Sequence, residues 1–194
     1  MSMSPTRAMP DDAGLAFLAA LQLADSSLPI GRMVHSQGLE AWLVGNLDAG
    51  PAQIGQVVET MILEVAAPLD GVILVHAHRA ADAPTLRALD AFATACKVTQ
   101  ASRDASSSCG RRLARIATRL APIEPALSTF FDDIATGSTP GHLAVVEGAL
   151  TRTLGLAERE AVLLEMRGAK VPCRLQAWRS AQHRRRQNWH NQAS

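Results

Sequence analysis

The sequence predicts an all-α protein, a single-domain bundle of several helices. Of its 194 residues, 47% are hydrophobic but only 4% are aromatic, and Tyr is absent. Ala and Leu dominate the apolar residues and favour helices, whereas sheets are rich in Val, Ile, Tyr and Phe. A chain of this length can bury a sizeable core, so we expect one helical domain over residues 11–166.

The first helix is expected to begin at about Asp12, after a disordered start over residues 1–10. Apolar residues recur at helical spacing as far as Leu23. Pro29 fixes its own φ and disfavours the α conformation at Leu28, so the helix must end before this point.

The segment after this helix is polar, and it carries His35 and Ser36. Gly31 and Gly38 lie on either side of it and give the backbone the freedom that a turn needs. A second apolar helical pattern begins near Ser36. A short connection between two apolar helices is a poor core element and a good surface for contacts with other proteins.

Further helices are expected along the rest of the chain. Pro51 and Pro84 suit the first turn of a helix, where a missing N–H costs nothing. Residues 72–81 include a strand-like apolar run, but their Ala/His/Arg continuation favours a helix. Thr139 or Gly141 is the expected cap of the last helix. The expected helical segments are 51–66, 72–81, 84–95, 102–120, 127–135 and 143–154, of which 102–120 begins with small residues that allow close approach by another helix.

Cysteine content and hydropathy indicate a cytoplasmic protein. Cys96, Cys109 and Cys173 show no C-x-x-C spacing, which suits free thiols in a reducing compartment. No apolar run approaches the roughly 18–20 residues of a membrane span, and the N-terminus lacks the pattern of a signal peptide. We therefore expect no membrane contact.

The net charge of +1 conceals an uneven distribution. Residues 1–166 hold 12 Lys/Arg and 18 Asp/Glu, whereas residues 167–194 hold 7 Lys/Arg and no acid. The sequence therefore predicts a basic C-terminal tail over 167–194. Binding of this tail to nucleic acid is an alternative function, but the tail lacks aromatic residues interleaved over a defined fold, so we do not expect nucleic acid to be the main partner.

The sequence offers no assembled catalytic or metal site. His76 and His78 would point about 200° apart on a helix, so they could not hold one ion together. His35 lies beside Ser36, but neighbouring residues seldom form a catalytic triad, and neither a G-x-S-x-G elbow nor a phosphate loop is present. We therefore expect a binding protein and no enzyme. A His-dependent metalloenzyme is the alternative, and it would require these histidines to converge with carboxylates.

Basic residues recur at helical spacing in the segment 102–120. Arg111, Arg115 and Arg119 share one helical face. Such a face is either simply solvated or docks onto an acidic partner, and the sequence leaves both interpretations open.

Three separated blocks of the sequence resemble the urease accessory protein F (UreF) family. The first block, within residues 21–43, reads L-Q-L-A-D-S-S-L-P-I-G and then H-S-Q-G-L-E. The second begins at Arg103 and reads R-D-A-S-S-S-C-G-R-R-L, and the third begins at Gly141 and reads G-H-L-A-V-V-E-G. The blocks occur in the family order and cover roughly residues 15–165. Arg32, Met33 and Val34 depart slightly from the pattern, since the family prefers a small residue and an aromatic there.

This resemblance implies a UreF-like helical fold and a role in urease maturation, as a chaperone. Members of the family are commonly homodimers that bridge UreD (also called UreH) to the GTPase UreG, and the assembly inserts nickel into apo-urease. They perform no bond chemistry, and nickel is carried chiefly by the GTPase, so no directly bound cofactor or metal ligand is expected here. The family motif positions imply that partner or dimer contacts are made by His35, Ser36, Glu40, Arg103, Arg112 and His142.

The C-terminal residues depart from the family pattern. Where the family continues with an Ala/Leu-rich helix, this chain becomes basic and carries Trp178 and Trp189. One interpretation is a natural basic tail, and the other is a shifted reading frame in which these tryptophans replace glycines. Because the family uses its C-terminal segment to dock UreD, we expect a native tail of this kind to weaken or abolish UreD binding.

Overall fold

The computed structural model describes residues 12–25, 27–32 and 38–168, and it is all-α over these residues, with no strand. The predicted fold class is therefore confirmed. The disordered start expected over 1–10 and nearly all of the predicted basic tail lie outside the described residues. The helices are α1 (Asp12–Ala24), α2 (Leu39–Gly45), α3 (Pro51–Thr60), the π-helical η2 (Met61–Gly71), α4 (Val72–Arg79), α5 (Ala83–Cys96), α6 (Gln100–Leu120), α7 (Pro125–Thr136), α8 (Leu143–Thr153) and a last helix over residues 158–168.

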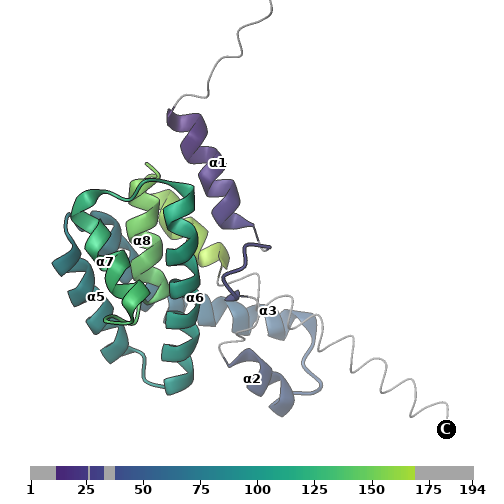
Figure 1. Cartoon of the computed structure of the whole chain (residues 1–194). Coiled ribbons are helices and arrows are strands. Elements are labelled where there is room, and N and C mark those ends of the chain that lie inside the picture. The colour runs from purple at the N-terminus through teal and green to yellow at the C-terminus, as the bar shows by residue number, and fades with distance from the viewer. Residues whose placement is uncertain (1–11, 26, 33–37, 169–194) are drawn as a thin grey trace, which may run out of the picture.

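Helix α8 is the centre of the bundle. Every residue from Ala144 to Thr151 is buried, because α4 and α6 pack against it and α5 and α7 complete the bundle (Figure 1). Phe130 and Leu150 are among the largest side chains with no exposed surface in this main core. Helices α2 and α3 extend to one side of the bundle and form a smaller core of their own around Leu39 and Val58.

Two glycines make this packing possible. A Cβ at Gly148 of α8 would lie 2.7 Å from the Cβ of Ala77 and 3.0 Å from the amide nitrogen of His78, both in α4. At Gly110 of α6, a Cβ would lie 2.8 Å from the amide nitrogen of Leu143. The small residues predicted to permit close approach in the segment 102–120 therefore do so where α6 meets the start of α8.

The helices α3, η2 and α4 follow one another without a break, although a separation after residue 66 was expected. The residues at both junctions keep right-handed helical dihedral angles. Pro68 lies inside η2 and has no backbone N–H, so a regular α register would lose a hydrogen bond there. A π-helical stretch is a known way for a helix to continue through such a position. The helix expected over 72–81 is confirmed as α4.

The predicted cap of the last long helix was wrong. The N-cap of α8 is His142, in an extended conformation, and neither Thr139 nor Gly141 occupies that position. The amide groups at this helix start are satisfied from another helix, because Asp90 of α5 accepts hydrogen bonds from the backbone N–H of Gly141 at 2.8 Å and of His142 at 2.6 Å. A contact with a residue so distant in sequence cannot be inferred from local capping preferences.

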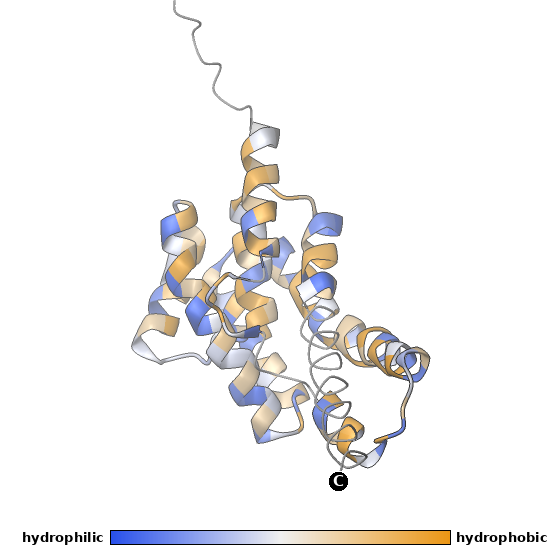
Figure 2. Cartoon of the chain, turned by 90° about the vertical axis from the view of Figure 1, so that its right-hand side faces the viewer, coloured by the Kyte–Doolittle hydropathy of each residue, from blue (hydrophilic) through white to orange (hydrophobic). Residues whose placement is uncertain are grey.

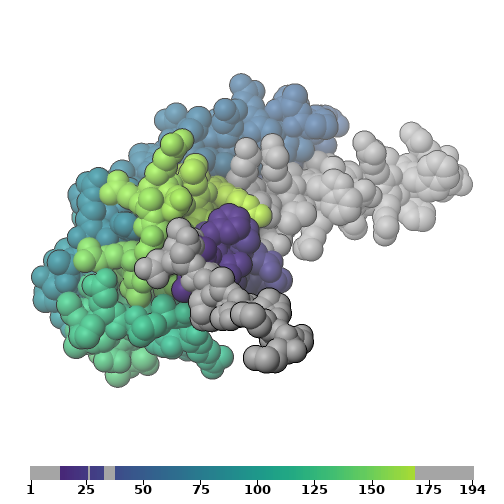
Figure 3. All heavy atoms as spheres, turned by 90° about the horizontal axis from the view of Figure 1, so that it is seen from above, coloured from purple at the N-terminus to yellow at the C-terminus, as the bar shows by residue number. Residues whose placement is uncertain are grey.

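Helix α1 lies beside the bundle and exposes apolar side chains. Figure 2 shows apolar residues along this helix, and Figure 3 shows its purple atoms next to the yellow-green atoms of the helix over 158–168. The two are joined where Arg167 donates a hydrogen bond to the carbonyl of Ala24. In the part of the chain that the structure describes, no helix is both long and apolar enough to cross a membrane.

We predict that Gly148→Ala destabilises the protein by about 2 kcal/mol or more, because the added methyl group overlaps α4 and the two helices must separate. Gly55→Ala in α3 is the matched control, since a Cβ there meets nothing within 4 Å and Ala favours the helix. This control should gain about 0.5–1 kcal/mol. Urea denaturation of both variants measures the difference, and equal stabilities would contradict the close packing of α4 on α8.

Candidate protein-binding site around the α1–α2 connection

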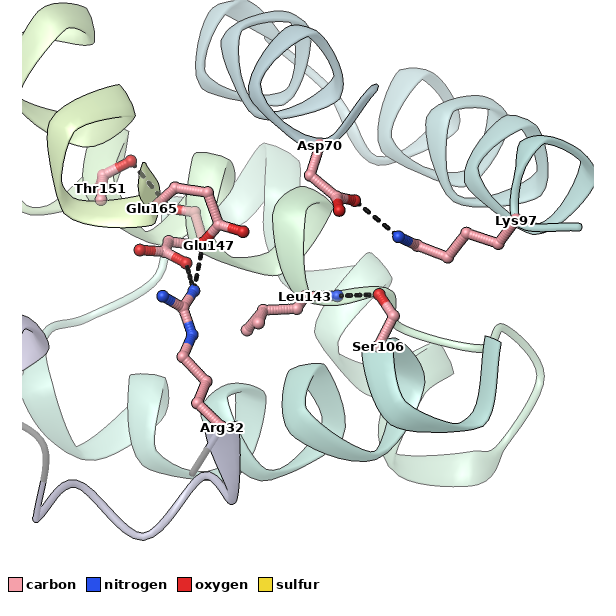
Figure 4. Close-up of polar contacts among 8 residues, drawn as sticks. All are labelled: Arg32, Asp70, Lys97, Ser106, Leu143, Glu147, Thr151 and Glu165. Carbon is pink, nitrogen blue, oxygen red and sulfur yellow. Dashed lines mark hydrogen bonds and ion pairs between the residues drawn. The ribbon is translucent and has the colours of Figure 1, made fainter. Parts of the chain in front are cut away.

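The connection between α1 and α2 is attached to the bundle by one buried arginine. Arg32 extends from this connection, and its Nη2 donates to a carboxylate oxygen of Glu147 in α8 and of Glu165 in the helix over 158–168 (Figure 4). The side chains of Arg32, Glu147 and Glu165 are 16%, 4% and 8% exposed. One guanidinium therefore joins three segments that are far apart in the sequence.

A second ion pair lies in the same region (Figure 4). Lys97, which follows α5, places its Nζ 2.7 Å from Oδ1 of Asp70 in η2. Together with Arg32, Glu147 and Glu165, these residues give three carboxylates and two cations, so the group would carry one excess negative charge if all of them were ionised. Buried charge of this kind is tolerated only where it is paired or removed by protonation.

The two glutamates respond to this environment in opposite directions. Burial raises the pKa of Glu147 well above its ordinary value, although the charge of Arg32 opposes this shift. Burial also disfavours the ionised form of Glu165, but the charge of Arg32 and a hydrogen bond from Glu147 outweigh burial and lower the pKa of Glu165. We therefore expect Glu147 to be the protonated member of the pair and Glu165 to carry the negative charge that balances Arg32.

Two of the predicted contact residues lie at the surface near this connection. Arg112 of α6 is exposed, and its guanidinium lies against Gly31, where a Cβ would overlap it. Gly31 has a φ of 87°, and Gly38 has a φ of 95°, so the predicted need for glycine on both sides is confirmed. Glu40 is exposed in the first turn of α2, at the other end of the connection. His35 and Ser36 lie outside the described residues.

Arg103 holds the turn between α5 and α6. Its Nη1 donates to the carbonyl oxygens of Lys97 at 2.5 Å and Val98 at 3.1 Å, and its Nη2 donates to Oε1 of Gln100 at 3.0 Å. These bonds give Arg103 a structural role, and its predicted contact with a partner stays a prediction. The residue lies at a different place in the fold from the α1–α2 connection.

His142 is an interior residue, 1% exposed. Its Nε2 lies 2.9 Å from Oγ1 of Thr94, and Nδ1 has no hydrogen-bond partner among the described residues. Its backbone N–H donates to Asp90, which also accepts from Oγ1 of Thr139 at 2.6 Å. The residue helps to fix the start of α8, and its predicted role in a partner contact stays a prediction.

Sequence reasoning missed the buried charges, namely Asp90, Lys97, Glu147 and Glu165. Glu147 was visible as a lone acid within the apolar run over residues 143–150, and Glu165 as a lone acid within 161–166. A single acid at a core position of an apolar helix indicates a buried partner. Nothing in the sequence, however, shows which basic residue provides the opposite charge.

The histidines of α4 do not form a metal site. His78 places Nε2 2.9 Å from the carbonyl oxygen of Leu156, whereas His76 is exposed. Among the described residues, no three His, Cys, Asp or Glu side chains are grouped so that they could hold a metal ion. The nucleic-acid alternative depends on residues 174–190, which lie outside the described part of the chain.

The comparisons with known proteins agree with the resemblance seen in the motifs. The family model named UreF matches residues 48–169. The match thus ends close to the start of the predicted tail, and it does not include the first motif block, over 21–43.

Curated relatives that carry the name urease accessory protein UreF include proteins of three bacteria. The protein of Corynebacterium efficiens is 32% identical over 145 residues, or 75% of this chain and 63% of the relative. That of Arthrobacter sp. (strain FB24) is 29% identical, over 77% of this chain and 65% of the relative. That of Yersinia pseudotuberculosis is 27% identical, over 78% of this chain and 67% of the relative. The chain therefore spans about two thirds of the length of these relatives. No solved structure matches it.

We predict that Glu147→Gln costs less than about 1 kcal/mol at pH 7, because the amide reproduces the donor and acceptor of a protonated carboxyl group. Glu165→Gln should cost at least about 1 kcal/mol more, because it removes the charge that balances Arg32. The double variant leaves Arg32 without a counterion and should lose about 3 kcal/mol. Urea denaturation tests the order, and a larger loss for Glu147→Gln than for Glu165→Gln would contradict the assignment of the proton.

We also predict a pH-dependent contribution from His142. Burial lowers the pKa of its imidazole, although the charge of Asp90 opposes this shift, so the folded protein holds His142 neutral. The unfolded chain gains a proton on His142 below about pH 6.5, and folding stability therefore falls on acidification below that pH. The stability advantage of the wild type over His142→Gln should shrink between pH 7.5 and pH 5, measured as melting temperature. The exposed His76→Gln is the control, and a parallel pH profile for both variants would refute the interpretation.

Proposed function

The chain belongs to the UreF family, and we propose that it acts in the cytoplasm as an accessory scaffold of urease maturation. In this role it bridges UreD (UreH) and the GTPase UreG, and the assembly delivers nickel to the subunits of apo-urease. Nickel is the cargo of the assembly and is carried chiefly by the GTPase. The chain itself performs no bond chemistry, because its task is to hold its partners together.

The observation that carries this proposal is the apolar surface of α1. The side chains of Leu15, Phe17, Leu18 and Leu21 are each at least half exposed, and no charged residue occurs from Ala13 to Ala24. A 13-residue helix is marginal in water without packing, and contiguous exposed apolar side chains mark sites of protein–protein contact. A second copy of the chain or an accessory partner would cover this surface, which supports both the bridging role and a homodimer.

Exposed arginines support a partner with acidic groups. Arg112, Arg115 and Arg119 are exposed and lie at helical spacing on α6, and within the described part of the chain none of them forms an ion pair. Arg111 differs, since its Nη1 donates to the carbonyl oxygen of Pro140 at 3.2 Å. Charges of this kind steer association and select partners of opposite charge. We therefore assign Arg112 to contacts with this partner. The first motif block implies the same role of partner contact for His35, Ser36 and Glu40.

We predict that Leu18→Asp combined with Leu21→Asp reduces co-purification of the chain with UreD, UreG and apo-urease, and lowers nickel-dependent urease activation by about tenfold or more. Introducing two charges into an apolar contact makes its burial unfavourable. Arg112→Glu should also weaken co-purification, by reversing a charge beside the connection.

The matched control is Val98→Asp. Val98 is 87% exposed in the turn between α5 and α6, away from α1 in Figure 1. This variant should co-purify and activate as the wild type does. If the wild-type chain co-purifies with none of these proteins, the proposed function is refuted. Equal loss of co-purification in the α1 variant and the Val98 control would refute the role of α1.

A further inference from the structure

The segment after α1, over residues 27–32, is held in the bundle by two of its residues. Ile30 is buried in the main core, and Arg32 bonds to Glu147 and Glu165. The arginine is 115 residues from Glu147 and 133 residues from Glu165 in the sequence. Arg32 therefore connects the N-terminal part of the fold to both α8 and the helix over 158–168.

The helix over 158–168 depends on few polar attachments in the described part of the chain. At its first turn, Glu158 pairs with Arg79 of α4 at 2.6 Å, but these side chains are 38% and 62% exposed. Near its end, Glu165 pairs with Arg32 in the interior, and Arg167 bonds to the carbonyl of Ala24. An exposed pair contributes little to stability, whereas loss of one partner of a buried pair is costly. Arg32 is thus the strongest polar attachment of this helix, which also packs into the main core through Ala161 and Val162.

One hydrogen-bond donor of the buried Arg32 side chain has no partner in the described part of the chain. Nε of Arg32 is buried and has no hydrogen-bond partner among the described residues. A buried donor without a partner costs part of the free energy that the ion pairs contribute. This cost reduces the advantage of the locked state and makes withdrawal of the arginine less unfavourable than the ion pairs alone suggest.

Charged and titratable groups surround Arg32 and the residues that it contacts. They are Asp70 of η2, Lys97 after α5, Cys109 and Arg112 of α6, Glu147 of α8 and Glu165 of the last helix. Lys97 is already paired with Asp70, and Arg112 is at the surface. Without Arg32, no unpaired buried cation remains for the two glutamates among the described residues. The charge left on this pair must then be neutralised by a proton or hydrated by water, and hydration requires the helix over 158–168 to move away from α8.

We propose that Arg32 is a releasable pin that locks the segment after α1 and the helix over 158–168 to α8. Its withdrawal leaves the carboxyl groups of Glu147 and Glu165 without a counterion, and it frees the helix over 158–168 from the bundle unless both groups are protonated. Movement of the segment after α1 is thereby coupled to the opposite end of the described chain. The pin is a property of the chain alone, so it goes beyond the proposed function and does not depend on it.

The test compares amide hydrogen exchange of the full chain, without partners, in the wild type and in Arg32→Gln at pH 8 and pH 5. At pH 8 the variant should exchange about tenfold faster than the wild type over residues 158–168, with a smaller increase in α5 and α7. At pH 5 the ratio should fall towards one, because the freed carboxyl groups are then protonated.

The matched control is Arg79→Gln, which removes the exposed ion pair of the same helix and should change its exchange by less than about threefold. Exchange over 158–168 that is unchanged in Arg32→Gln at pH 8, or raised equally in α5 and α7, would overturn the proposal. If Arg32→Gln is unfolded at pH 8, the proposal requires it to refold at pH 5, and a variant that stays unfolded at both values would also overturn it.

Discussion

The buried contact of Arg32 with Glu147 and Glu165 is the interaction on which the outer parts of this structure depend. The bundle of α4 to α8 has its own apolar core, which continuous apolar contacts hold together. The segment after α1 and the helix over 158–168 are added to this core at its edge. They meet at one guanidinium, and the buried charge around it adds to the apolar contacts that Ile30 and Ala161 make with the core.

Residues of the family motifs stabilise the fold as well as provide exposed surface. Gly110 and Gly148 allow α6 and α4 to approach α8. His142 lies buried at the start of α8, where its backbone N–H donates to Asp90. Arg103 closes the turn between α5 and α6. A residue that matches a family pattern can therefore serve packing. Motif residues that are buried in the structure have this role, whereas exposed motif residues can contact a partner.

The sequence predicted the helices well because their evidence is local. Apolar spacing located the helical segments, and Pro51 and Pro84 marked helix starts by a steric rule that applies whatever the rest of the chain does. The continuous path from α3 to α4 and the cap of α8 could not be predicted, since they depend on a π-helical register and on Asp90 in another helix. The ion pairs of Arg32 could not be predicted either, because helical periodicity carries no information about which charges distant in the sequence form pairs. Of the predicted contact residues, Arg112 and Glu40 lie exposed beside the connection, whereas His142 lies inside.

The proposed scaffold role needs a rigid body and surfaces that respond to one another. The α8-centred bundle provides the rigid body, and α1 provides an apolar surface attached to it through Ile30 and Arg32. The most direct test of this account is a double-mutant cycle between Arg32→Gln and Glu165→Gln in a Glu147→Gln background, where one guanidinium faces one carboxylate. Urea denaturation at pH 7 should give a coupling free energy of about 2–3 kcal/mol, as expected for a buried ion pair. A coupling below about 0.5 kcal/mol, typical of an exposed pair, would contradict the account.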